Sequence, residues 1–74
     1  MKFFVLDNQN NICNQIELLK NLSIDVEIID GMVSNNPIEE YQKDKFDFLV
    51  IDSTSNNCLD IFNKIIQIIL LIQL

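Results

Sequence analysis

Histidine and arginine are absent from this 74-residue sequence, and glycine and proline occur once each. The single glycine, Gly31, excludes the glycine-rich loops that hold nucleotide phosphates. Cys13 and Cys58 lack the spacing of zinc ligands, and without histidine a zinc site would have to recruit carboxylates. We therefore expect two reduced thiols, with a disulfide or a reactive thiol as the less favoured alternatives.

Positive charge and long apolar runs are also scarce. Five basic residues oppose eleven acidic ones, and the net charge of −6 disfavours contact with nucleic-acid phosphates. After Met1 and Lys2 a run of only four apolar residues precedes Asp7, too few for a signal-peptide core, and no run approaches the roughly 20 residues of a membrane span. We expect a cytoplasmic chain with neither nucleic acid nor membrane as a partner.

Apolar residues make up 49% of the chain, which excludes intrinsic disorder and predicts one small domain over residues 1–74. Unbroken or alternating apolar runs predict strands at residues 3–6, 24–28 and 46–52. Ile12, Ile16 and Leu19, and then Leu18 and Leu22, recur at three- and four-residue spacing, which predicts a helix at 11–22 with one stripe toward the core. The same kind of spacing predicts a third helix from Asn56 or Asn57, either of which can cap it. A second, short helix is expected at 37–44 from the residues that start it. Asn36 and Pro37 supply the start of the second helix.

The last ten residues, 65–74, are apolar at eight positions and fit either the end of the third helix or a fourth buried strand. The lack of glycine and proline after Pro37 favours the helix. Such a surface, if uncovered, marks an interface, so we expect self-association or partner binding through this segment.

Alternation of strands and helices predicts an α/β fold with a parallel sheet. Acidic residues alternate with apolar ones at Asp25 and Glu27, which places the second strand at the edge and predicts the flavodoxin-like order 2-1-3. Asp7 and Asp52 then end neighbouring strands at one sheet edge, where two carboxylates can share Mg²⁺ and a phosphoryl group. The alternative is that both aspartates only form turns, as Asn8, Asn10 and Asn11 are expected to do.

The sequence resembles the receiver domains of response regulators over about residues 1–66. The resemblance lies in the segment from Met1 to Asn8, in the strand from Phe46 to Asp52, and in the segment from Cys58 to Ile65. It implies that Asp52 accepts phosphate from a histidine kinase or phosphotransfer protein. It also implies that Asp7, Asn8, Asp52 and the Thr54 carbonyl hold Mg²⁺.

Three departures from the family pattern imply an impaired phosphoacceptor. Asn8 replaces the family's second acidic residue, the Met-Pro turn after the phosphoacceptor is replaced by residues 53–56, and the chain ends before the family's switch Ser or Thr and its Lys. We therefore expect the N-terminal portion of a receiver-like signalling domain that is not an enzyme.

Two other classes of function remain open. A degenerate or truncated receiver-like module could bind partners without phosphotransfer, through its helices or the unprotected edge of the third strand. A Mg²⁺-dependent phosphohydrolase of the haloacid dehalogenase type is the remote alternative, since its motif needs an aspartate where Gln9 stands.

Overall fold

The computed structural model describes residues 1–9, 11–22 and 24–73, with side chains described as far as Leu70. Three strands alternate with three α-helices and two short 3₁₀ segments. In chain order these are β1 (Lys2–Leu6), α1 (Asn11–Glu17), η1 (Leu18–Leu22), β2 (Glu27–Asp30), η2 (Gly31–Val33), α2 (Pro37–Gln42), β3 (Phe48–Ile51) and α3 (Asn56–Gln73).

The strands form a parallel sheet in the order β2-β1-β3, which confirms the predicted order. Phe4, at the centre of β1, is in register with Ile29 on one side and Leu49 on the other. The fold is mixed α/β and is compatible with part of a flavodoxin-like domain.

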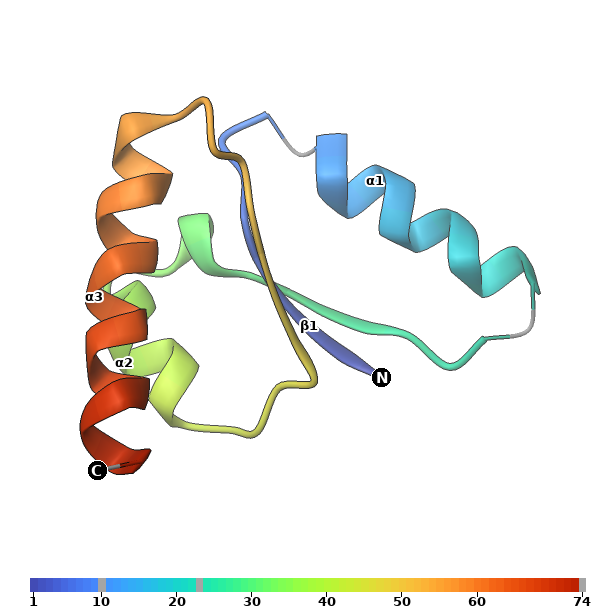
Figure 1. The fold of residues 1–74 in the computed structure, drawn as a ribbon. Coiled ribbons are helices and arrows are strands. Elements are labelled where there is room, and N and C mark those ends of the chain that lie inside the picture. Colours follow the sequence, from blue (N-terminus) through green and yellow to red (C-terminus); the bar gives the residue numbers. More distant parts are fainter. Residues whose placement is uncertain (10, 23, 74) are drawn as a thin grey trace.

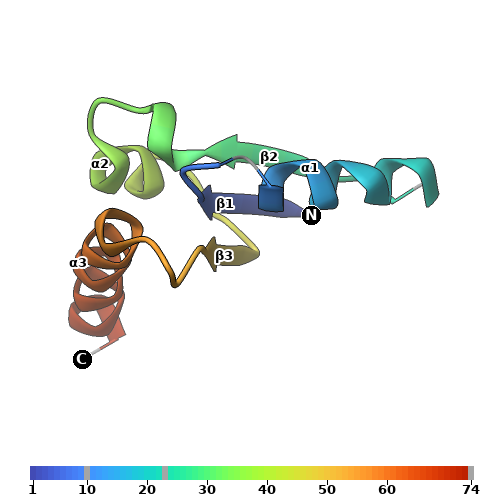
Figure 2. The same cartoon turned by 90° about the horizontal axis from the view of Figure 1, so that it is seen from above.

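Helices cover both faces of the sheet, with α1 on one side and α2 and α3 on the other (Figures 1 and 2). Each face has its own apolar cluster, because successive side chains of a strand point to opposite faces. The buried members on the α1 side are Phe3, Val5, Ile16 and Val26, and those on the α2–α3 side are Phe4, Leu6, Cys58 and Ile65.

Two predicted strands are shorter than expected. β2 runs from Glu27 to Asp30 rather than from Ile24 to Ile28, and its first pair is Glu27 with Lys2. β3 begins at Phe48, because the Asp47 carboxylate accepts the Lys2 N–H at 2.8 Å while the Asp47 N–H donates to the Lys2 carbonyl at 2.9 Å. At the start of β3 a side chain therefore takes the place of a backbone acceptor.

The first predicted helix is α-helical only to Glu17 and continues as the 3₁₀ segment η1. Leu18 and Leu22, which the predicted stripe assigned to the core, are 62% and 69% exposed. The change to three residues per turn breaks the α-helical spacing on which that stripe depends. The part of the stripe that packs on the sheet consists of Ile12, Ile16 and Leu19.

The caps of the later helices are partly as predicted. Asn36 caps α2, with its Oδ1 accepting the Glu39 N–H at 3.2 Å, but α2 ends at Gln42 rather than near Asp44. Ser55, not Asn56 or Asn57, stands before α3. Its Oγ accepts the Cys58 N–H at 3.4 Å and its carbonyl accepts the Leu59 N–H at 3.0 Å.

Helix α3 runs without interruption to Gln73, so residues 65–73 are helical and the strand alternative is wrong; residue 74 lies outside the described residues. Of the side chains described there, Ile65 is buried and Leu70 is 53% exposed. No described helix combines the length and apolarity needed to cross a membrane.

Gly31 is required by a close approach of the chain to the core. A Cβ on this residue would lie 2.5 Å from Cε1 of Phe4 and 2.9 Å from Cδ2 of Leu6, both of which are fully buried. We expect Gly31→Ala to lower the free energy of unfolding by about 1–3 kcal/mol, the usual cost of overpacking a core. Urea unfolding of the variant and the wild-type chain measures the difference.

The matched control is the same change in a Phe4→Leu background, where the smaller side chain leaves room for the added methyl group. Gly31→Ala should cost clearly less there than in the wild-type chain. An equal cost in both backgrounds would show that contact with Phe4 is not the reason for the glycine.

Candidate functional site

The two aspartates singled out by the sequence follow neighbouring parallel strands. Asp7 comes directly after β1 and Asp52 directly after β3, and Leu6 is in register with Ile51. The Asp52 N–H donates to the Leu6 carbonyl at 2.8 Å, so pairing continues to the last residue of β1. Both residues therefore stand at the carboxyl edge of the sheet, the placement that the sequence predicts.

Asp7 is almost fully buried, with 3% of its surface exposed. Its Oδ1 accepts the Gln9 N–H at 3.0 Å and its Oδ2 accepts the Ile12 N–H at 2.7 Å. A buried carboxylate is tolerated only when it is hydrogen-bonded in this way. Asp7 thus fixes the turn after β1 and the first turn of α1, a turn-forming role that the sequence leaves open.

Asp52 is half-buried and forms its hydrogen bonds within the turn that follows it. Its Oδ1 accepts the Thr54 hydroxyl at 2.6 Å and the Thr54 backbone N–H at 3.0 Å. These two donors, the hydroxyl more than the N–H, lower the pKa of Asp52 below its ordinary value. Asp52 is therefore ionised at neutral pH, as a nucleophilic carboxylate has to be.

A side-chain hydrogen bond joins the two loops at this edge. Asn8 donates from Nδ2 to Oγ of Ser55 at 2.6 Å, which links the loop after β1 to the residue before α3. Ser55 was missed by the sequence reasoning, although serine directly before a helix is a strong capping signal. Asn56 and Asn57, which follow it, are equally good capping residues, and the prediction placed the cap at one of them instead.

The predicted ligands supply oxygen atoms, the donors that Mg²⁺ prefers. They are the Asp7 and Asp52 carboxylates, the Asn8 amide and the Thr54 carbonyl. The described residues contain no group of three or more histidine, cysteine or acidic side chains suited to a metal. Two carboxylates are a number typical of Mg²⁺ sites, in which the ion keeps several of its own waters, but both oxygens of Asp7 already accept backbone N–H groups.

Comparisons with protein-family models, with curated proteins and with solved structures find no match for the chain.

The pKa of Asp52 provides a direct check on the turn. We expect Thr54→Val, which removes the hydroxyl but keeps the backbone N–H, to raise the pKa of Asp52 toward its ordinary value. Because the folded-state pKa is lowered, the turn stabilises the fold at neutral pH, and this contribution is lost as the pH falls through the folded-state pKa. Carbon-detected NMR of the Asp52 carboxyl group during a pH titration measures the shift.

Ser53→Ala is the control, because the two described hydrogen bonds to Asp52 come from Thr54 and not from its neighbour. It should leave the titration of Asp52 unchanged. An unaltered midpoint in Thr54→Val would contradict the account of the turn.

Proposed function

We propose that this chain is a receiver-like phosphoacceptor domain in which Asp52 takes a phosphoryl group from a phosphohistidine. The donor is a histidine kinase or a phosphotransfer protein. One observation carries the proposal: the Asp52 N–H donates to the Leu6 carbonyl, which holds an ionised, half-buried carboxylate beside the end of β1, the strand that Asp7 directly follows. The parallel order β2-β1-β3 supports it, since ligands of such sheets bind beyond the carboxyl ends of the strands.

In this proposal the two oxygens of Asp52 have different tasks. Oδ1 accepts both Thr54 hydrogen bonds, which hold the carboxylate in one orientation. Oδ2 is then the attacking atom. It forms a bond to phosphorus as the bond from phosphorus to the histidine nitrogen breaks, and the products are an acyl phosphate and a free imidazole.

Asp7, Asn8, Asp52 and the Thr54 carbonyl would hold Mg²⁺ in this proposal. When bound, the ion supplies positive charge that offsets the charge developing on the transferring phosphoryl group. Asn8 contributes no negative charge, and its Nδ2 is engaged with Ser55. We therefore expect weak binding of the ion and slow phosphotransfer.

The second candidate function is an interaction module without phosphotransfer. It is favoured by the hydrogen bonds of Asp7, since both of its carboxylate oxygens already accept backbone N–H groups. In that case Asp7 and Asn8 would serve only to join the loops, and the domain would act through its surface.

Phosphoramidate, a small donor with a phosphorus–nitrogen bond, separates the two functions. Incubation with phosphoramidate and MgCl₂ should add the mass of one phosphoryl group to a fraction of the wild-type chain. Asn8→Asp should increase that fraction, because it restores a negative charge beside the ion. Intact-mass spectrometry at several times measures both yields.

Asp52→Asn should abolish the mass increase, whereas Asp60→Asn, an exposed change on α3, should not. Phosphorylation that survives in Asp52→Asn would overturn the assignment of Asp52. The absence of any mass increase in both the wild-type chain and Asn8→Asp would favour the interaction module instead.

A further inference from the structure

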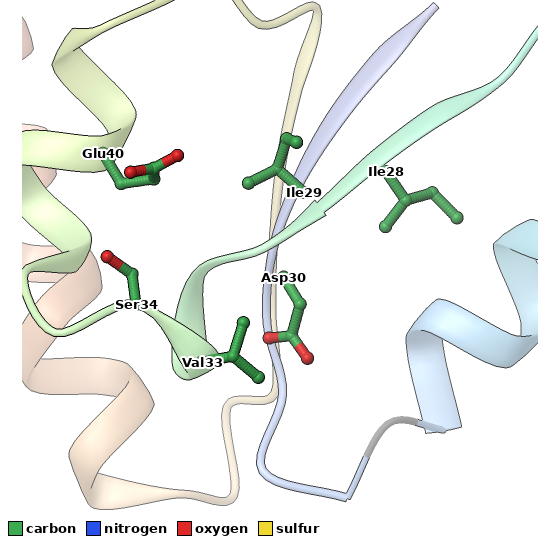
Figure 3. Close-up of a pocket in the computed structure, with 6 residues that line it drawn as sticks. All are labelled: Ile28, Ile29, Asp30, Val33, Ser34 and Glu40. Carbon is green, nitrogen blue, oxygen red and sulfur yellow. The ribbon is translucent and has the colours of Figure 1, made fainter.

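A groove of about 300 Å³ lies beside β2, and neither Asp7 nor Asp52 lines it (Figure 3). Its lining residues come from β2, η2, the residue after η2 and α2, and they are Ile28, Ile29, Asp30, Val33, Ser34 and Glu40. Ile28 packs with the α1-side cluster and Ile29 with the α2–α3 cluster, so the two side chains lie on opposite faces of the sheet. β1 occupies one edge of β2. Ile28 and Ile29 can therefore line the same groove only at the other edge of β2, which we call the outer edge.

The same edge of β2 presents backbone groups for pairing. Within the described sheet, β2 pairs with β1 alone. Glu27 donates its N–H to the Met1 carbonyl at 2.8 Å on the β1 side. Because backbone groups of successive strand residues alternate between the two edges, the N–H and C=O of Ile28 face outward, along the groove. Such an edge is a template for an added strand.

The charged side chains that line the groove are all acidic. Asp30 and Glu40 line the groove, Glu27 lies on the strand, and the described lining contains no basic side chain. Glu40 pairs with Lys43 at 3.6 Å and Glu27 with Lys2 at 3.7 Å. Exposed pairs of this kind contribute little, so a competing cation can replace the lysines.

We propose that the outer edge of β2 binds an extended segment of a partner protein in which lysine or arginine alternates with apolar residues. The segment adds to the sheet through the backbone of Ile28. Because side chains of an extended segment alternate between the faces of a sheet, its cations lie on the α2 face, where they meet Glu40, and its apolar side chains lie on the α1 face, where they contact Ile28. The proposal does not depend on phosphorylation of Asp52.

Charge repulsion also disfavours a second copy of this chain as the partner that binds the outer edge of β2. Pairing two β2 edges would bring Glu27 and Asp30 close to the same acidic residues of the other copy, and each chain carries a net charge of −6. Like charges opposed across strands are destabilising. The described strands of this chain also lack the required pattern, since Lys2 is their single basic residue.

A blocked peptide of alternating valine and lysine is the probe. Titration into the full chain, followed by amide NMR, should shift the resonances of β2, η2 and α2, and binding should slow hydrogen exchange at Ile28. Glu40→Gln should weaken binding about fivefold, the effect of one exposed charge pair, whereas Asp30→Asn, on the opposite face of the sheet, should weaken it less. Lys43→Gln should tighten it, because it removes the cation that competes for Glu40.

Two altered peptides and one control variant test whether binding depends on charge, on backbone pairing and on this edge of the sheet. A valine–glutamate peptide should not bind, and methylation of the backbone nitrogens of both the valine and the lysine residues should remove binding, because it blocks the backbone donors toward either edge without removing charge. Asp60→Asn, on α3, should bind the probe like the wild-type chain. The proposal is overturned if the probe does not bind, if the N-methylated peptide binds equally well, or if Asp60→Asn weakens binding as much as Glu40→Gln.

Discussion

The structure depends on β1, which is packed on both faces and hydrogen-bonded along both edges. Phe4, Val5 and Leu6 are completely buried and alternate between the two apolar clusters. Both of the other described strands, β2 and β3, take their register from this one. The position of Asp7 and the position of Asp52 follow from where β1 ends, so the candidate site depends on the strand at the centre of the sheet.

Asp7 connects stability with the proposed chemistry. Burial of its carboxylate is offset by the N–H groups of Gln9 and Ile12, which also start the turn and the helix that follow. A ligand that draws charge from Asp7 would therefore act on the attachment of α1 as well. This is a physical route by which events at Asp52 could alter the α1 side of the molecule.

The sequence was sufficient to predict the strand order, because the acidic alternation at Asp25 and Glu27 and the apolar run of β1 are local patterns. It was sufficient for the cap at Asn36 for the same reason. The start of β2 depends on its pairing with β1, and the 3₁₀ winding at Leu18 and the exposure of Leu22 depend on contacts between segments far apart in the chain. Local sequence patterns do not predict either. The contact of Gly31 with Phe4 and the groove beside β2 were beyond prediction, because each joins segments far apart in the chain.

The central claim is that Asp7 and Asp52 form one site at the carboxyl edge of the sheet. Carbon-detected NMR of both carboxyl groups during a MgCl₂ titration tests it most directly. The account predicts that the two carboxyl resonances shift together, with one dissociation constant, and that Asp60 does not follow them. A shift of Asp52 while Asp7 remains unmoved would contradict it, and would leave Asp7 with its structural role alone.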